Sequence, residues 1–482
     1  MYQARLKIVL FYLISAIFIL LNAYFLVKKH SLAVNVLPLA FTVVLLAVFA
    51  LDKLLYLVVF FTPLSLPLSE LIYGLNFNMF LPTEPLLFGI LLIFVLKLIA
   101  NRSFDQEILK HPVSIAIYFG LFWIFVTSLT SSMPMVSLKF FLSRIWFIVS
   151  FYLLAAKLFD SGKNIEKYVW LYILPLILVI FYTTFRHLGY GLWDKQAAHF
   201  VMDPFYNDHT AYGAAIAMYL PFLFGFTFTK MYKPSVRFFV WICFGILLMA
   251  LVLSYARAAW LSMFAVLGVW ILMRLKIRFK HLFLTFIISL SVILVFQNQI
   301  LMYLERNTTE SSANLVDHLS SMSNISSDAS NLERLNRWSC AIRMFEDRPV
   351  FGWGPGTYMF QYAPYQLKAD RTIISTNSAN GGNAHSEYLG PLAESGVLGP
   401  IYMLILIGIV VYTGIHAYSR ATDKRLKTLA MGALLGLITY YIHGTMNNFL
   451  DTDKLSVPFW GFTAMIVAID IHTRKEQKTA ES

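Results

Sequence analysis

The sequence predicts an all-α, polytopic integral membrane protein of about 12–14 transmembrane helices with one large loop outside the membrane. Three observations predict this class. Hydrophobic residues make up 58% of the 482 residues and charged residues 13%, whereas soluble domains carry roughly 25% charged residues. The mean hydropathy is +0.66. Apolar runs recur along the chain, many near the length of about 20 residues that a helix needs to cross the hydrocarbon core.

Fourteen apolar runs are candidate spans in the lipid bilayer. In chain order they cover residues 8–27, 32–51, 54–68, 85–100, 112–131, 138–158, 166–185, 211–229, 237–255, 258–274, 281–303, 397–418, 427–446 and 456–472. The first follows a basic N-terminus like that of a signal peptide. It is too long for one and lacks a small-residue cleavage site, so we expect a retained span. The run 54–68 is short and broken by prolines, which predicts a re-entrant segment or a merger with its neighbour. A tight turn at SYARAAW separates 237–255 from 258–274.

The distribution of lysine and arginine predicts the orientation of these spans. With the N-terminus in the cytoplasm, 23 basic residues fall on the inner side and 8 on the outer side, leaving out residues 304–396. Cytoplasmic loops are enriched in basic residues, so we expect both termini inside and 304–396 outside. The basic residues form short groups between spans. The net charge of +12 therefore reflects topology and does not indicate a nucleic-acid partner.

The chain divides into three predicted parts. Residues 1–303 are expected to form an N-terminal bundle of about 11 spans, and residues 397–482 about three spans and a short cytoplasmic tail. Between them, 304–396 forms the large outer loop. Its first part, NTTESSANLVDHLSSMSNISSDASN, is polar and predicts a linker. The next part places Leu335, Trp338, Ile342 and Phe345 at helical spacing, and the turn cluster GWGPG follows.

Several common functional motifs are absent from the sequence. It has no phosphate-binding Walker loop, dinucleotide fingerprint or metal-ligand pair at zinc spacing. The two cysteines, Cys243 and Cys340, give no disulfide framework. The stretch DTD at 451–453 resembles the Asp-x-Asp pair that holds a metal and a sugar nucleotide. It falls in an outer loop, where cytoplasmic sugar nucleotides are absent, so we expect no metal there and no cofactor.

Four arginines are candidate anion ligands on the outer face. Arg257 lies between two apolar runs, where an arginine faces an anionic partner or a cavity, or else extends its charge to the interface. Arg144 lies deeper, in LKFFLSRIWFIVSFYLL, as a further anion contact or a structural partner. Arg334 and Arg337 flank Trp338 on the amphipathic helix, where the alternative is an ordinary solvated face.

His385, in NAHSEYLGPLAESGVLG, is the candidate base. Asn383 is a good N-cap residue, so we expect a helix through this stretch with His385 in its first turn. A histidine there is neutral near pH 7 and can accept a proton. The alternative is a surface histidine in a loop. Glu387 should face another side of that helix, and Glu394 should hold a helix end or an interhelical contact.

Fixed positive charges and one base on the outer face suit one kind of chemistry. Arginine binds phosphate through a planar, bidentate fork and stays charged. A nearby histidine can deprotonate a hydroxyl group. Glycosyl transfer from a lipid diphosphate to a hydroxyl acceptor requires both, and needs no metal if arginines neutralise the leaving diphosphate.

Several segments, in the same order, make the chain similar to the bacterial O-antigen ligase and O-antigen polymerase superfamily. LSYARAAWLSMF resembles its Ser-Arg-Gly-x-Trp segment, with Ala258 where glycine is frequent. RWSCAIRMFEDRPVFGWGPGTY resembles the Arg-Trp to Gly-rich segment of the large periplasmic loop. NAHSEYLGPLAESGVLG resembles the histidine segment that ends this loop, with Ser386 where asparagine is also common. DPFYNDHTAYGAAIAMYLP resembles the entry to the following span. The resemblance covers about residues 203–472.

The resemblance implies roles for particular residues. His385 would be the catalytic base, and Arg257 with Arg337 or Arg334 would hold the diphosphate of an undecaprenyl-linked glycan. We expect the larger contribution from Arg337, which directly precedes Trp338 as in the family pattern. Supporting roles are expected of the following residues: Arg144, Glu387, Glu394, Asp208, His209 and Trp338.

The resemblance also implies a location and a reaction. The protein would lie in the bacterial inner membrane with its site at the periplasmic face. Its acceptor would be lipid A–core, as for a ligase, another glycan chain, as for a polymerase, or a protein serine. Two other classes fit less well. A lipid-linked glycan transporter would line a central path with charges, and a sensor would need a cytoplasmic output domain.

Overall fold

The computed structural model describes residues 2–29, 33–71, 79–101, 104–228, 232–275, 329–368, 371, 375 and 382–481. Within these ranges regular structure is almost entirely helical. The exception is one antiparallel pair, β1 (Leu66–Pro67) with β2 (Phe80–Leu81), in which Leu66 pairs with Leu81. The predicted all-α class is confirmed.

Ten described helices are long and apolar enough to cross a membrane, which makes this a multi-pass membrane protein. They are α5 (Thr83–Asn101), α7 (Pro112–Leu129), α8 (Pro134–Ile148) continued by η3 (Val149–Leu154) and α9 (Ala155–Leu158), α10 (Gly162–Leu188), α11 (His209–Phe228), α12 (Pro234–Leu253), α13 (Arg257–Arg274), α19 (Leu398–Arg420), α20 (Lys424–His443) and α21 (Asp453–Glu481).

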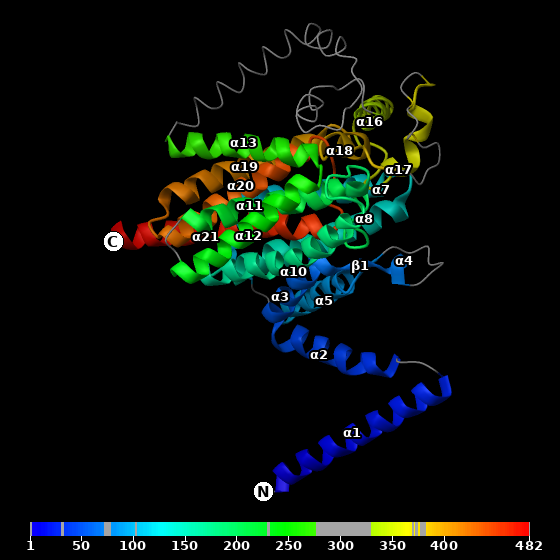
Figure 1. Cartoon of the computed structure of the whole chain (residues 1–482), viewed down its shortest axis with the longest axis vertical. Helices are drawn as coiled ribbons and strands as arrows, with labels where there is room; N and C mark the ends of the chain where they lie inside the picture. The colour runs from blue at the N-terminus through cyan, green and yellow to red at the C-terminus, as the bar shows by residue number, and fades with distance from the viewer. Residues whose placement is uncertain are drawn as a thin grey trace.

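The remaining helices of the N-terminal region are α1 (Tyr2–Lys29), η1 (Ala33–Asn35), α2 (Val36–Phe49), α3 (Leu51–Phe61), η2 (Thr62–Leu64) and α4 (Leu68–Leu71). Of these, α1 is itself 28 residues long and lies apart from the bundle (Figure 1). The proline-broken run 54–68 gives only the short α3, because Pro63 follows directly in η2. The predicted span 281–303 and the linker up to residue 328 lie outside the described residues.

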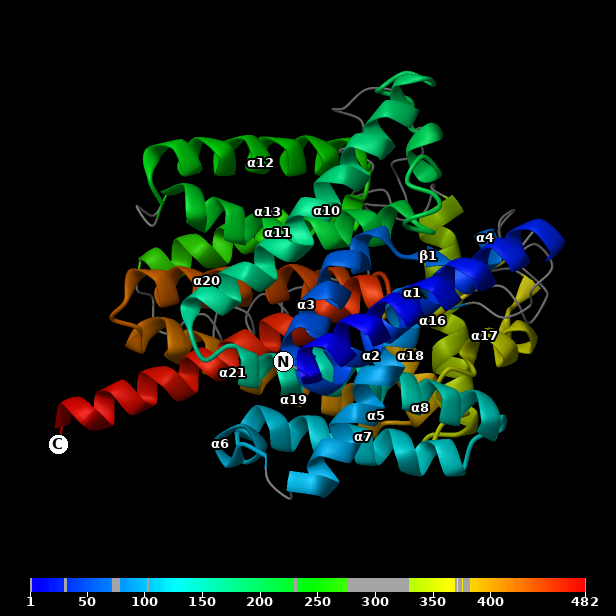
Figure 2. The same cartoon turned by 90° about the horizontal axis from the view of Figure 1, so that it is seen from below.

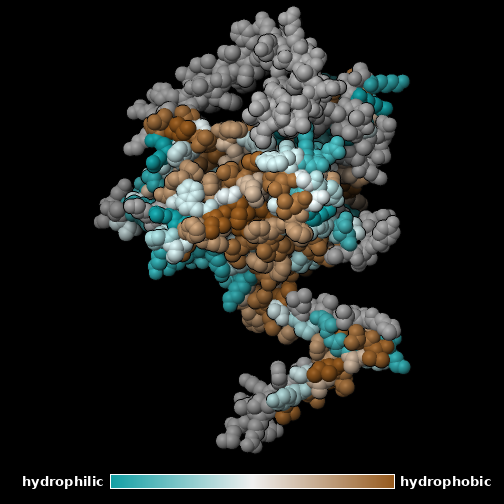
Figure 3. Space-filling view, viewed as in Figure 1, coloured by the Kyte–Doolittle hydropathy of each residue, from teal (hydrophilic) through white to brown (hydrophobic). Residues whose placement is uncertain are grey.

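The innermost helices carry the core. In the apolar windows of α11 and α21, 89% of residues are buried, against 17% in α5. Small residues bring α11 and α20 together: a Cβ on Gly432 would lie 2.6 Å from the Phe222 ring, and one on Gly436 would lie 2.5 Å from the Met218 carbonyl. Hydrophobic residues cover the middle of the bundle, while hydrophilic ones gather toward its ends (Figure 3).

The spanning helices alternate in direction, so their loops sort to two ends. The C-terminus, the α19–α20 turn and α6 (Gln106–Leu109) lie at one end, with most of the described basic groups predicted to be cytoplasmic. The other end carries η4 (Ala197–His199), α16 (Ala329–Asp347), α17 (Tyr358–Gln361), η5 (Ala363–Tyr365) and α18 (Leu389–Ser395). Figures 1 and 2 both show α16, α17 and α18 opposite the C-terminus.

The predicted amphipathic helix and turn cluster are both present at this second end. The helix is α16, and in GWGPG all three glycines have positive φ: 67° at Gly352, 113° at Gly354 and 75° at Gly356. The cluster docks on the α7–α8 turn, where the Ser132 amide donates to the Trp353 carbonyl at 2.9 Å. A Cβ on Gly354 would lie 1.9 Å from the Ser131 hydroxyl. Only glycine fits this close, left-handed turn.

Candidate functional site

His385 lies in a loop, and the prediction that it occupies the first turn of a helix is wrong. Helix α18 begins only at Leu389, and His385 has a φ of 49°. The Asn383 side chain accepts from the His385 amide at 3.0 Å, and the Ser386 hydroxyl accepts from the amides of Tyr388 and Leu389. Asparagine and serine side chains compete in this way with helical hydrogen bonds. The result is a tight turn that presents the histidine.

Helix α16 packs against this turn. The Trp338 indole donates to the His385 carbonyl at 3.4 Å. The residue before Trp338, Arg337, is only 3% exposed. Its Nε donates to Glu333 at 2.6 Å, and its guanidinium lies 3.9 Å from the centroid of the Tyr362 ring. Gly382, with a φ of 130°, lets the backbone pass within contact of that guanidinium. Arg337 is therefore held in one orientation beside the histidine turn.

The surroundings of His385 keep its imidazole neutral. Burial lowers its pKa to about 4, and the charges of Arg334 and then Arg337 add to the effect. Asp208 and Glu333 oppose it. Within the described part of the chain, no side-chain hydrogen bond is made by this imidazole. A neutral imidazole beside two guanidinium groups can accept a proton at pH 7.

Asp208 and His209 belong to the same group. They lie where the loop after η4 enters α11, and the Asp208 carboxylate accepts from the Thr210 amide at 2.7 Å and contacts His209 Nδ1 at 3.2 Å. Despite burial, which would raise it, the pKa of Asp208 is lowered, chiefly by its bond to His209. The His209 ring stacks on His199 with centroids 4.2 Å apart.

Arg257 joins this group from the side of α13. The predicted tight turn is present, with a φ of 49° at Tyr255, and Arg257 is the first residue of α13. Burial lowers the pKa of His199 to about 4, and the charges of His209 and Arg257 contribute. A series of neighbouring charged and ring side chains thus leads to His385: Arg257, His199, His209 and Asp208.

Two histidines of this region were not predicted from the sequence. One is His199. The other is His443, at the end of α20, whose Nε2 lies 3.2 Å from the Asn447 side chain; Asn447 in turn lies 3.5 Å from the Thr210 hydroxyl. His199, in KQAAHF, lies in the outer loop between the predicted spans 166–185 and 211–229, and His443, in YIHGTMNN, lies at the outer end of the predicted span 427–446. A search for every histidine at this face would have found them.

Comparison with known proteins bears on the same residues. Residues 242–404 match the O-antigen ligase family. This segment is therefore similar to O-antigen ligases. A curated protein of Haemophilus influenzae, described only as uncharacterized, is 22% identical over 245 residues, which are 51% of this chain and 59% of that protein. This chain thus covers less than two thirds of that relative's length. The predicted resemblance to the ligase and polymerase superfamily is confirmed.

The segment that matches the O-antigen ligase family contains most of the predicted site. Arg257, Arg334, Arg337, Trp338 and His385 all lie within the matched residues, although α13 and α16 are separated by more than 50 residues of chain. Glu387 and Glu394 also lie within it. Three predicted site residues lie outside the matched segment: Arg144 in α8, His209 at the start of α11 and Asp208 directly before it.

Glu387 is a structural anchor of the histidine turn. Its Oε1 accepts from the Tyr440 hydroxyl at 2.6 Å and from the amides of Phe449 and Leu450 at 2.8 and 3.0 Å. Burial raises the pKa of this carboxyl, whereas the hydrogen bond from Tyr440 and the charge of Arg144 act to lower it. Glu387 lies two residues after His385, so these bonds tie the histidine turn to the α20–α21 loop.

Glu394 anchors the GWGPG cluster. Its Oε1 accepts from the Tyr358 amide at 2.9 Å, and its carbonyl accepts from the Gly354 amide at 2.8 Å. Burial raises its pKa to about 7. This is a structural contact of the kind expected from the sequence.

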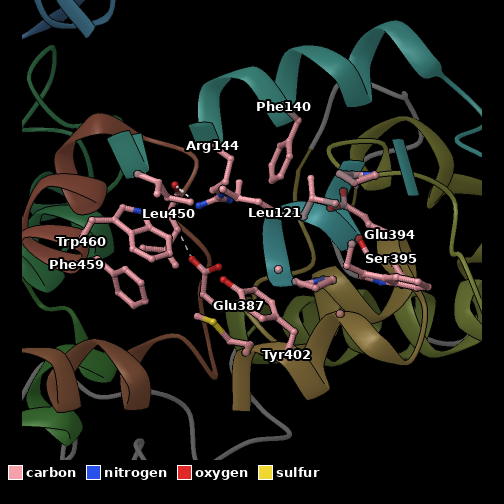
Figure 4. A pocket seen from close by; sticks show the side chains of 18 residues that line it. Leu121, Phe140, Arg144, Glu387, Glu394, Ser395, Tyr402, Leu450, Phe459 and Trp460 are labelled. Carbon is pink, nitrogen blue, oxygen red and sulfur yellow. Dashed lines mark hydrogen bonds between the residues drawn. The ribbon is translucent and has the colours of Figure 1, made fainter. Parts of the chain in front are cut away.

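Arg144 lies apart from the His385 group. Its NH1 donates to the Leu450 carbonyl at 2.7 Å, and its guanidinium lies 4.9 Å from the Phe140 ring centroid. It lines a pocket with Glu387 and Glu394, whereas His385 is not among the lining residues (Figure 4).

The DTD stretch shows no metal-ligand arrangement. Asp453 accepts hydrogen bonds from Ser65 and Thr83, and the Lys454 ammonium donates to the Thr62 and Ser65 carbonyls. These bonds fasten α21 to the N-terminal helices. Among the described residues, no group of three histidine, cysteine or acidic side chains could hold a metal ion.

Proposed function

We propose that this protein transfers a glycan from an undecaprenyl-diphosphate carrier to a hydroxyl acceptor, in the manner of an O-antigen ligase. The observation that carries the proposal is a neutral histidine beside two guanidinium groups, within the segment that matches the O-antigen ligase family. The reaction would take place at the periplasmic face of the inner membrane, the side to which the basic-residue bias assigns this end of the bundle.

The arginines would bind the donor diphosphate. Arg257, Arg334 and Arg337 supply positive charge from α13 and α16 around the histidine turn. Arginine neutralises the charge that develops on a leaving diphosphate without a change in its own protonation. The donor thus needs no metal ion for binding in this mechanism.

An apolar cavity would receive the polyprenyl chain. It has a volume of about 450 Å³ and lies between α11, α12, α13 and α20, lined by hydrophobic side chains such as Phe224, Phe244 and Trp270. Trp260 and Leu251 line its end nearest Arg257. A lipid with its diphosphate at Arg257 would place its first isoprene units here, where apolar surface is buried at no polar cost.

His385 would act as general base. The acceptor hydroxyl gives its proton to the neutral imidazole while its oxygen forms a bond to the anomeric carbon. The bond from that carbon to the diphosphate oxygen breaks, and undecaprenyl diphosphate leaves with the electron pair. Asp208 supports the proton transfer because its carboxylate favours the imidazolium that forms.

The acceptor we propose is lipid A–core, with polymerisation of lipid-linked repeats as the alternative. A deletion strain tests the two. Lipid-linked polymer that accumulates beside uncapped core indicates a ligase, whereas core carrying a single repeat indicates a polymerase. Normal, fully capped glycan chains in the deletion strain would contradict both.

A further inference from the structure

A pocket on the outer half of the bundle carries charges that the proposed reaction does not use. Its walls come from α7, α8, α19 and α21, with side chains such as Leu121, Phe140 and Met403. Its roof comes from the turn at Pro355, from Glu387 and from helix α18. Arg144, Glu387 and Glu394 are its charged residues. Figure 4 shows Arg144 and Glu387 facing the same hollow, with Glu394 farther along it.

Arg144 has capacity to bind a guest. Of its five N–H donors, the only bond within the described residues is from NH1 to the Leu450 carbonyl. Burial raises the pKa values of Glu387, Glu394 and Asp451, and the nearby charge of Arg144 opposes that rise in each. Yet no described carboxylate lies within the 4 Å of an ion pair with Arg144. A gap therefore separates the cation from the anions.

Glu387 also keeps an unused acceptor. Glu387 uses Oε1 for all three of its hydrogen bonds, and no bond from a described residue reaches its Oε2. Glu387 is one of the residues that line the pocket, on the side opposite Arg144 (Figure 4). Buried charges are costly unless they are paired, so a ligand that fills the gap with both signs of charge would be favoured.

We propose that this pocket binds the headgroup of an ethanolamine phospholipid, with the phosphate on Arg144 and the ammonium between Glu387 and Glu394. A purely anionic headgroup would bring its charge against two or three carboxylates, and a purely cationic one would oppose Arg144. A zwitterion with its charges side by side satisfies both. The apolar side chains below the charged roof suit the start of an acyl chain.

The size of the pocket agrees with a headgroup. Its volume is about 80 Å³, and one water needs roughly 10–15 Å³ on the same measure. Several heavy atoms therefore fit, as a phosphoethanolamine requires, while the rest of the lipid would lie outside along the spanning helices.

The test measures lipid binding by the purified full-length protein in a neutral detergent, by native mass spectrometry and thermal unfolding. The probes are dioctanoyl phosphatidylethanolamine, phosphatidylcholine and phosphatidylglycerol at equal concentrations. The quaternary ammonium of phosphatidylcholine has no N–H donors for the carboxylates, and phosphatidylglycerol lacks the cation. We expect the ethanolamine lipid to bind most tightly and to raise the unfolding midpoint most, because a ligand that binds only the folded state stabilises it.

Arg144→Gln and Glu394→Gln should each weaken binding of the ethanolamine lipid about tenfold or more, as expected for loss of a charged hydrogen bond. Lys139→Gln is the matched control, because it removes one positive charge from an exposed position on the same helix. It should bind like the unmodified protein. Leu121→Trp fills the pocket without a change of charge and should also weaken binding of the ethanolamine lipid. It replaces Arg144→Gln as the test variant if Arg144→Gln does not fold.

Equal binding of the three lipids would overturn the proposal. So would an unchanged preference for the ethanolamine lipid in Arg144→Gln or in Leu121→Trp. Since no step measures glycan transfer, a failure here leaves the proposed enzyme function untouched.

Discussion

At the scale of single residues, His385 is the most informative side chain. Its left-handed backbone and the bonds made by Asn383 and Ser386 turn it out of the helix that follows. Burial and two arginines then favour its neutral form. Backbone geometry and electrostatics therefore act together to prepare a proton acceptor.

His385→Ala should lower turnover about 10²–10⁴-fold, the usual contribution of general base catalysis. Donor affinity should change little, since the arginines bind the diphosphate. The measurement is transfer from a purified lipid-linked donor in vitro, with donor binding measured separately. His416→Ala, at the opposite end of α19, is the control and should keep activity. Full turnover in His385→Ala would show that His385 is only a loop residue.

The pH dependence should separate the free enzyme from the donor complex. Protonation of His385 removes the base, so activity falls as the pH falls through its pKa. For kcat/KM, which reports the free enzyme, the acid limb should lie near pH 4. The bound diphosphate favours the imidazolium, so the acid limb of kcat should lie at a higher pH. Identical limbs for both parameters would indicate that His385 does not face the diphosphate.

Arg334 and Arg337 should respond differently to substitution by lysine. Arg337→Lys loses the planar fork that bonds Glu333 and stacks on Tyr362, so we expect a lower unfolding midpoint and the larger loss of kcat/KM. Arg334→Lys keeps the charge at a partly exposed position and should raise KM with little effect on stability. Arg257→Lys should be strongly impaired while still reaching the membrane. Near-normal kcat/KM in all three variants would remove the arginines from donor binding.

At the scale of elements, the GWGPG cluster couples the outer loop to the transmembrane bundle. Its backbone bonds to Ser132 on one side and to Glu394 on the other. The histidine turn is fixed in the same way, through Glu387 and the α20–α21 loop. The site is therefore positioned by loops that are themselves anchored on spanning helices.

Gly354→Ala tests this anchoring. The alanine Cβ would overlap Ser131, and the residue would have to keep a φ of 113°. We expect a loss of at least about 2 kcal/mol in unfolding free energy and reduced activity, measured by thermal unfolding and transfer assays. Gly245→Ala in α12 is the control, because nothing lies within 4 Å of its added Cβ. Equal unfolding midpoints for the two variants would contradict the anchoring role.

At the scale of the whole molecule, the bundle separates two faces. Most of the described basic groups at the helix ends gather at the face of the C-terminus, and the candidate site lies at the other. The alternating direction of the spanning helices places successive loops at opposite faces, whichever face lies outside the cell. The sign of the charge bias is what assigns the site to the periplasm.

Alkaline phosphatase fusions test that assignment, since the enzyme is active only outside the cytoplasm. A fusion after residue 320 should be active and a fusion after residue 422 inactive. A fusion after residue 161, between α9 and α10, should match the second. The reverse pattern would place the site in the cytoplasm and remove the lipid-linked donor from reach.

The sequence by itself determined the all-α membrane class and the positions of most helices, because both depend on local physical properties. Hydropathy and charge act over one span and its flanks, so they predicted the apolar helices, the tight turn before Arg257 and the sorting of basic residues. The spacing in α16 and the glycines of GWGPG were equally local, and the order of the segments predicted the resemblance to O-antigen ligases. Only the tertiary structure decided which of these residues meet. Asn447, which contacts His443, meets Thr210 across 237 residues of chain. Arg144 lies in a pocket that carboxylates also line, and Asn383 and Ser386 hold His385 outside a helix. These outcomes depend on packing between distant segments and on competition for backbone hydrogen bonds, which no local pattern in the sequence records.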